Sequence, residues 1–213
     1  MPTDEHPPRA RRKDAALNNE RLMVAARGVF ARKGLSATLE DIAKEAGVGV
    51  GTVYRNFSSK REIVETLYDA TIDSAFADVQ AALQIDDPWT AIATFFEATA
   101  ARQAQDRGLC EMMLGHNDIG PDEHTAEKLV AAVAPLFDRA TRAGVLRDGV
   151  VTTDILPIFA MLYSIYGLSE AHPELWRRYL ALLLDGLRAG DRPALPVPAL
   201  DVASFTTALA SAD

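Results

Sequence analysis

The segment from Thr38 to Phe57 constrains this chain most, because two short helical patterns flank a tight glycine turn there. Thr38 places a hydroxyl where it can cap a helix, and Asp41 falls in the first turn, where the helix dipole favours an acid. That helix stops at Gly47, and a second apolar period runs from Val50 to Phe57. This arrangement is typical of a helix-turn-helix.

Helical periods also surround this segment. One begins at Leu17 and closes at Gly34, and Ser59 with Glu62 forms a capping box that opens a helix over 60–84. The rest of the chain shows no strand-like alternation. Further helices are predicted over 88–104, 107–115, 122–143, 154–168 and 173–188. The predicted fold class is therefore all-α.

The charge of the chain is divided unevenly. The net charge is −8, yet residues 1–68 carry +3 and residues 69–213 carry −11. Only the first third suits a polyanionic partner, because the acidic remainder would repel phosphates. We therefore expect any contact with nucleic acid to be confined to the N-terminal part.

The two short helices meet the demands of DNA recognition. Small residues at the start of the second helix would let its backbone approach the bases and phosphates of a major groove about 12 Å wide. Thr52 and Arg55 can reach base edges. The residues that can reach phosphates are Tyr54, Asn56, Lys60 and, through its hydroxyl, Thr38. The predicted DNA-binding residues are Thr38, Gly49, Val50, Gly51, Thr52, Tyr54, Arg55, Asn56 and Lys60.

The sequence over residues 14–70 resembles the tetracycline-repressor (TetR) family. The resemblance rests on Arg21-Leu22, Ala25-Ala26, Phe30, Gly34, Thr38, Ile42-Ala43, Ala46-Gly47-Val48, Gly51-Thr52-Val53-Tyr54, Phe57 and Ser59-Lys60. Two positions depart from the family pattern: Gly49 stands where many members have serine, and Asn56 where many have histidine. The phosphate contacts that the family makes at these two positions therefore cannot be assigned directly to Gly49 and Asn56.

The resemblance implies an effector-responsive transcriptional regulator, usually a repressor, that binds a pseudo-palindromic double-stranded DNA operator as a homodimer. It implies a three-helix DNA-binding domain and a C-terminal helical domain that dimerises and holds a small molecule. We expect a disordered basic arm over 1–13, the DNA-binding domain over 14–62, the effector-binding and dimerisation domain over 63–188, and a flexible tail over 189–213. The last residues of this tail could stay loose or form one weak helix. The arm could lie along phosphates or in a minor groove, or merely aid solubility.

The helices predicted over 154–168 and 173–188 offer more apolar surface than a small monomer can easily bury, which also favours a dimer. The residues expected at the four-helix interface are Ile155, Phe159, Leu162, Tyr163 and Tyr166 on one helix, and Trp176, Leu180, Leu183, Leu184 and Leu187 on the next. A ligand cavity is expected among the C-terminal helices. Its candidate lining is Phe95, Phe96, Met112, Met113, His116, Phe137, Phe159, Tyr163 and Tyr166, although each of these could instead be core packing.

Other functions have weaker support in the sequence. The run Gly47–Gly51 is not preceded by a strand, which argues against a dinucleotide-binding loop. His116, Asp118, Asp122 and His124 could bind a metal, but such clusters are more often solvated loops, so no metal and no cofactor are predicted. No catalytic motif is present, and an enzyme is not expected.

The remaining expectations concern location and the rival functions. The chain lacks an apolar run of about 20 residues and a signal-like start, and its single cysteine, Cys110, suits a reducing compartment, so we expect it in the cytoplasm with no membrane contact. Two rivals stay open: a DNA-binding activator or architectural factor without an effector, and a helical small-molecule enzyme that uses 38–57 as scaffold.

Overall fold

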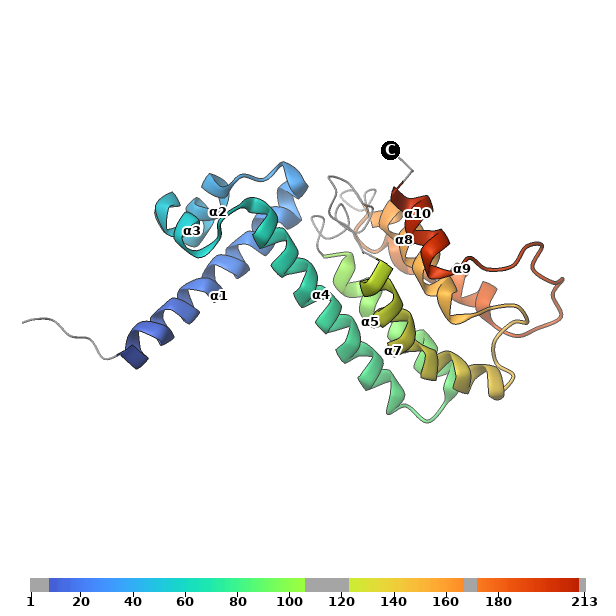
Figure 1. Ribbon diagram of the computed structural model, residues 1–213. Coiled ribbons are helices and arrows are strands. Elements are labelled where there is room, and N and C mark those ends of the chain that lie inside the picture. Colours follow the sequence, from blue (N-terminus) through green and yellow to red (C-terminus); the bar gives the residue numbers. More distant parts are fainter. Residues whose placement is uncertain (1–7, 106–122, 167–171, 211–213) are drawn as a thin grey trace, which may run out of the picture.

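The computed structural model describes residues 8–105, 123–166 and 172–210. Helices form almost all of the ordered structure in these ranges, which also hold one isolated β-bridge between Leu146 and Arg188. The predicted all-α class is confirmed. The helices are α1 (Pro8–Lys33), α2 (Leu39–Ala46), α3 (Val50–Asn56), α4 (Lys60–Leu83), α5 (Pro88–Gln103), α7 (Glu123–Arg142), α8 (Ile155–Tyr166), α9 (Leu175–Leu187) and α10 (Val202–Ala210) (Figure 1).

The first core joins α1, α2, α3 and the first turns of α4. Ile42 of α2 and Val53 of α3 are fully buried against Phe30 of α1, and Ile63 of α4 closes the cluster. These are the apolar positions that recur at helical spacing in the sequence. The N-terminal part is thus a small helical domain with its own core.

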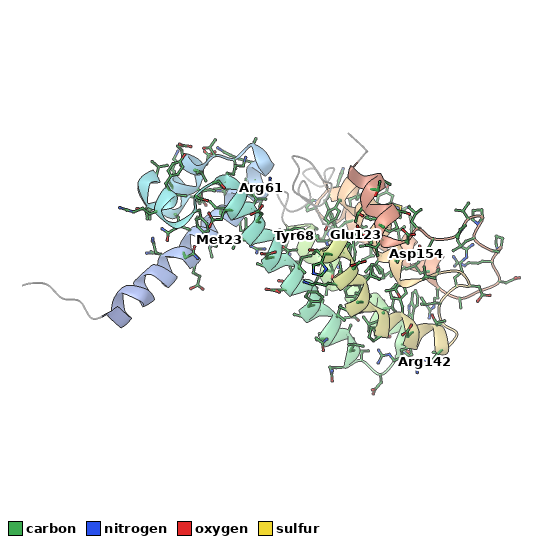
Figure 2. The ribbon with its side chains drawn as sticks, viewed as in Figure 1. Met23, Arg61, Tyr68, Glu123, Arg142 and Asp154 are labelled. Atoms are coloured by element: carbon green, nitrogen blue, oxygen red, sulfur yellow. The ribbon has the colours of Figure 1, made fainter. Side chains whose placement is uncertain are left out.

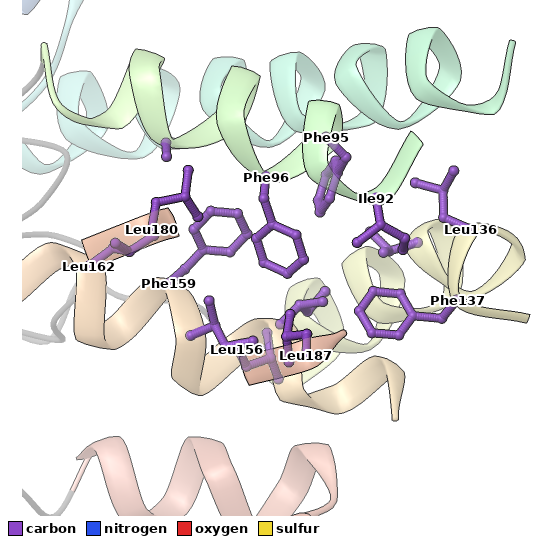
Figure 3. Close-up of a cluster of buried hydrophobic side chains, with 14 of the residues drawn as sticks. Ile92, Phe95, Phe96, Leu136, Phe137, Leu156, Phe159, Leu162, Leu180 and Leu187 are labelled. Carbon is purple, nitrogen blue, oxygen red and sulfur yellow. The ribbon is translucent and has the colours of Figure 1, made fainter. Parts of the chain in front are cut away.

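The second core lies inside the bundle of α5, α7, α8 and α9. Phe95 and Phe96 of α5 meet at 5.4 Å between ring centroids, and Phe96 lies 5.3 Å from Phe159 of α8. Leu136 and Phe137 of α7 complete the cluster (Figure 3). This bundle is the larger, acidic part of the chain.

Helix α4 belongs to both cores. Its first half buries Ile63 and Leu67 in the N-terminal domain, and its second half buries Val79 and Ala82 in the bundle. Figure 1 shows α4 running continuously from one part to the other. Helix α4 is therefore the one long helix in the described residues that is buried in both cores.

Two terminal boundaries differ from the expectation. Helix α1 begins at Pro8, so residues 8–13 are helical rather than part of an arm. These residues lack an apolar period, but arginine, lysine and alanine favour a helix, and proline is accepted at its first position.

The C-terminal segment also contains a helix. The last residues of the expected tail over 189–213 were left open as a loose tail or one weak helix. They form α10, whose Val202 and Phe205 pack against the bundle core. Asp201 caps this helix by accepting a hydrogen bond from Ser204 N at 2.7 Å. Two apolar side chains one turn apart suffice to dock a short helix that sequence periodicity alone would not reveal.

Candidate nucleic-acid interface

The turn between α2 and α3 is built from specific local interactions. Thr38 Oγ1 accepts a hydrogen bond from Asp41 N at 3.2 Å, and Asp41 Oδ2 accepts one from Thr38 N at 3.1 Å, which completes a capping box. Gly47 ends α2 with φ of 68°, in the left-handed region that favours glycine. Val48 N then donates to Ala43 O at 3.0 Å, so the backbone reverses over two residues.

A cation fixes the start of α2 to the end of α1. Lys33 Nζ donates to Asp41 Oδ1 at 2.6 Å. This bond, with the backbone hydrogen bond from Thr38, holds the pKa of Asp41 below its ordinary value. The capping carboxylate therefore stays ionised at neutral pH.

Helix α3 is anchored along one face only. Val53 is fully buried, and Phe57, which follows the last turn, is also buried. Arg55, two residues from Val53 along α3, lies on the opposite side and is exposed. Val50, 38% exposed, and Tyr54, 54% exposed, lie at the edge of the buried side. A seven-residue helix is thus held by one apolar stripe while the other stripe faces solvent.

The polar side chains of α3 differ in how they are held. Arg55 is exposed and its Nη2 donates to Thr52 Oγ1 at 3.0 Å, which positions the guanidinium along the outer face. Asn56 is half-buried, and its Nδ2 donates to Thr52 O at 2.7 Å. Asn56 therefore bonds to its own helix, in keeping with its departure from the family pattern.

Two glycines give the start of α3 an open backbone. A Cβ built on Gly49 or Gly51 would meet no atom within 4 Å, and neither residue has a positive φ. The fold of this chain does not itself require glycine at either position. Their lack of a side chain becomes useful only if another molecule approaches the backbone.

The third element at this surface is the start of α4. Ser59 Oγ accepts from Glu62 N at 3.2 Å, while the Glu62 carboxylate accepts from Ser58 Oγ at 2.7 Å and from Ser58 N at 2.6 Å. The two bonds from Ser58, first from its hydroxyl and then from its backbone N–H, lower the pKa of Glu62. Lys60 is the first residue of α4 and is half-buried. The sequence-predicted residues thus come from three neighbouring elements: the start of α2, the length of α3 and the start of α4.

A cavity lies inside the bundle, where α4, α5, α7, α8 and α10 meet. Its volume is about 50 Å³, which leaves room for only a few water molecules. Its walls are mainly apolar, with some polar groups. The lining residues are Tyr68, Thr71, Ile72, Ala75, Phe95, Thr99, Arg102, Gln103, Thr125, Ala126, Leu129, Leu156, Phe159, Ala160, Tyr163 and Phe205.

The structure places the predicted ligand-binding residues in three groups. Phe95, Phe159 and Tyr163 line the cavity. Phe96, Phe137 and Tyr166 are buried in the bundle core without lining it. These three side chains take the place in core packing that the sequence left open for each of them. The Tyr166 hydroxyl donates to Ala100 O at 3.1 Å. Met112, Met113 and His116 lie outside the described residues.

Sequence reasoning missed the α4 and α10 contributions to this cavity. Tyr68 lies on α4 where the bundle begins (Figure 2), and Thr71 follows one turn later. On α5, Thr99, Arg102 and Gln103 place polar groups at helical spacing in an otherwise apolar face. These three polar residues of α5 were the available sequence signal for a cavity, because a buried helix face rarely carries three polar residues without a role.

Most of the residues predicted for the dimer interface are buried within the chain, although Leu162 and Leu183 also line a hollow at the surface of α8 and α9. Ile155, Phe159, Leu162, Tyr163 and Tyr166 are buried inside the same chain, as are Trp176, Leu180 and Leu187, while Leu183 and Leu184 are half-buried. Both helices are apolar on more than one side, so periodicity could not decide which side faces inward. The exposed apolar side carries Met161, 49% exposed, and Leu182, 58% exposed, with Ile165 and Tyr179 beside them.

Among the residues with a described placement, no group of three or more His, Cys, Asp or Glu could hold a metal ion. Three of the four candidate ligands, His116, Asp118 and Asp122, lie outside the described residues. No helix in the described ranges is both long and apolar enough to cross a bilayer.

Comparisons with known proteins agree with this architecture. The family model for bacterial regulatory proteins of the tetR family matches residues 22–67. A second model, for the C-terminal domain of SbtR-like transcriptional regulators, matches residues 87–189. The two matches correspond to the helix-turn-helix domain and to the bundle.

Individual relatives extend over different lengths. The HTH-type transcriptional regulator SrpR of Pseudomonas putida is 30% identical over 190 residues, 85% of this chain and 80% of that protein. An HTH-type regulator of Staphylococcus aureus is 31% identical over 83 residues, 38% of this chain, and the match spans only 44% of its own length.

Solved structures show the same organisation. A TetR transcription regulatory protein from Mycobacterium vanbaalenii superposes with a TM-score of 0.57 at 27% identity, over 84% of this chain and 99% of that one. Members of this family are transcriptional regulators rather than enzymes. The chain therefore belongs to the TetR family of transcriptional regulators, and its helix-turn-helix is the DNA-binding domain of that family.

Proposed function

We propose that two copies of this chain bind a pseudo-palindromic operator and repress transcription until a small molecule releases them. The observation that carries the proposal is α3, which is anchored by Val53 and Phe57 and presents an exposed, small-residue face. A helix held in this way can enter a major groove without disturbing its own core. The proposal places the protein in the cytoplasm, with the operator.

Each exposed group at this surface has a proposed contact. Arg55 and Thr52 read base edges, since both lie on the outer part of α3 and are held together by a hydrogen bond. Tyr54, Lys60 and the Thr38 hydroxyl bind phosphates, which fixes the orientation of the domain.

The remaining predicted residues act through the backbone or through packing. Gly49, Val50 and Gly51 form the part of α3 that lies closest to the groove. Asn56 stabilises α3 through its bond to Thr52 O and contributes little to DNA contact.

The homodimer forms through the exposed apolar side of α8 and α9. Met161, Ile165, Tyr179 and Leu182 lie together there, with a shallow hollow between them. Two copies of this side produce a four-helix interface of the kind common in symmetric dimers. The dimer would set its two α3 helices about 34–36 Å apart, one turn of B-DNA.

Effector release works through α4. The cavity is lined by Tyr68, Thr71 and Ala75 of α4, and the same helix is buried in the DNA-binding domain at Ile63, five residues before Tyr68. Because the cavity holds only a few waters, a larger ligand must push its walls apart. A ligand that binds the opened bundle more tightly would favour a spacing of the two α3 helices that no longer fits DNA.

The experiment begins with selection of a binding site from a random duplex pool, since the operator is unidentified. Fluorescence anisotropy then compares the wild type with a Tyr54→Ala, Lys60→Ala double variant and with Val24→Ala, an equally simple truncation at an exposed position of α1. We expect the double variant to lose at least about tenfold in affinity and Val24→Ala to bind normally. Equal affinity of the wild type and the double variant refutes the proposed interface.

A further inference from the structure

An ion pair lies at the wall of the cavity in the bundle, where Arg102 lines the cavity and Asp78 does not. Asp78 of α4 faces Arg102 of α5, whose Nη2 lies 2.5 Å from Asp78 Oδ1 and also contacts Oδ2. Thr99 Oγ1 donates to Asp78 Oδ2 at 3.0 Å. The Asp78 side chain is only 13% exposed, so this pair is substantially shielded from water.

Arg102 is the one charged side chain among the described residues that line the cavity. Asp78 lies behind it and supplies the opposite charge. An anionic ligand that approached Arg102 would bring a second negative charge next to the Asp78 carboxylate, and like charges at such distances repel strongly. A cation would find no carboxylate in the described lining. The pair therefore makes the described wall electrically neutral.

Two threonine hydroxyl groups of the lining are already bonded within the protein. Thr71 Oγ1 donates to Leu67 O at 3.0 Å, and the Thr99 hydroxyl donates to Asp78. Each donor that is already bonded offers less to a ligand, because displacing the existing bond has its own cost. Apolar atoms of Phe95, Phe159 and the other lining side chains provide the remaining surface.

We propose that this cavity takes an uncharged, mainly apolar molecule, and that Asp78 determines this preference by neutralising Arg102. The inference rests on the proposed function, because it names the chemical class of the effector for the same regulator. It makes Asp78 a specificity-determining residue that acts through Arg102 without lining the cavity itself.

The test uses two fluorescent probes that share one ring system. N-phenyl-1-naphthylamine is neutral, and 8-anilino-1-naphthalenesulfonate carries one sulfonate; both brighten in apolar surroundings. Titrated into the full chain without DNA, the neutral probe should bind at least about tenfold more tightly than the anionic one. Wild-type protein that binds the sulfonate equally or more tightly overturns the inference.

Removing the Asp78 charge tests its role directly. In Asp78→Asn, Arg102 loses its counter-ion, so the dissociation constant of the anionic probe should fall about tenfold while that of the neutral probe changes by less than about threefold. Glu65→Gln is the matched control, because it removes a carboxylate from an exposed ion pair with Arg61 on the same helix. An unchanged probe preference in Asp78→Asn overturns the role of Asp78.

Two further variants keep the result decisive. If Asp78→Asn does not fold, the double variant Asp78→Asn, Arg102→Gln replaces it, because this variant keeps a neutral wall without the ion pair. The double variant should retain the preference for the neutral probe. Loss of that preference overturns the electrostatic argument. Ala160→Phe fills the cavity from α8 and should abolish binding of the neutral probe. Binding that survives this change, or no binding to the wild type, removes the cavity as the ligand site and leaves the DNA-binding proposal to its own titration.

Discussion

Gly51→Ala should stabilise the protein and weaken its binding to DNA. Gly51 is an exposed residue in the first turn of α3, and a Cβ built there meets no atom within 4 Å. Replacing an unstrained helical glycine by alanine contributes about 0.5–1 kcal/mol of stability, mostly through the unfolded chain. For a chain of this size, that gain corresponds to a rise in Tm of about 1–4 °C.

The same methyl group has the opposite effect at the DNA surface. If the α3 backbone lies against the groove, the added methyl group overpacks that contact, and insertion of one carbon into a close-packed contact costs about 1–3 kcal/mol. The expected loss of operator affinity is therefore about fivefold to a hundredfold. Stability and affinity move in opposite directions, which general damage to the domain cannot produce.

The assay pairs thermal denaturation with operator anisotropy at one fixed salt concentration. Gly28→Ala, a similar change inside α1 where the new Cβ would make only ordinary contacts of 3.5 Å and longer, should raise Tm without altering affinity. A Gly51→Ala variant that binds the operator as tightly as the wild type would show that the backbone of α3 does not approach DNA closely at this position.

Three further predictions concern the turn, the dimer and pH. Gly47→Ala should destabilise the protein by about 1 kcal/mol in urea denaturation, because its φ of 68° is unfavourable for a side chain; an unchanged midpoint would contradict this. Leu182→Arg should convert a dimer to monomers in sedimentation, whereas Val197→Arg, at another exposed site, should not; a Leu182→Arg dimer would rule out this interface. Because hydrogen bonds lower the pKa of Asp41 in the folded protein, its contribution to stability is complete above the ordinary value of 3.8 and is lost as pH falls below it. Asp41→Asn should flatten that acid dependence in chemical denaturation, and a dependence equal to that of the wild type would contradict the assignment.

Local sequence signals predicted the helices well. Thr38 and Ser59 were identified as caps and Gly47 as a helix end, and each has that role in the structure. These features depend on residues within four positions of one another. Periodicity and capping are therefore enough to define the DNA-binding unit.

Features that depend on which helices become neighbours were harder to predict. Helices α8 and α9 are apolar on several sides, so the sequence could not show that Leu162 faces inward and Met161 outward. The cavity combines Tyr68 of α4 with Phe205 of α10, residues far apart in the chain. The ion pair between Asp78 and Arg102 likewise exists only once α4 lies against α5.

The central claim is that α3 lies in the major groove of the operator. Affinity cleavage tests this most directly: in a Cys110→Ser background, an iron chelate attached at Val50→Cys on α3 is compared with one attached at Val151→Cys, an exposed position of the bundle. We predict that the chelate on α3 cuts the operator within two half-sites one helical turn apart, and that the chelate on the bundle leaves them intact. Operator-bound protein that cuts the half-sites no better from α3 than from the bundle would contradict the account.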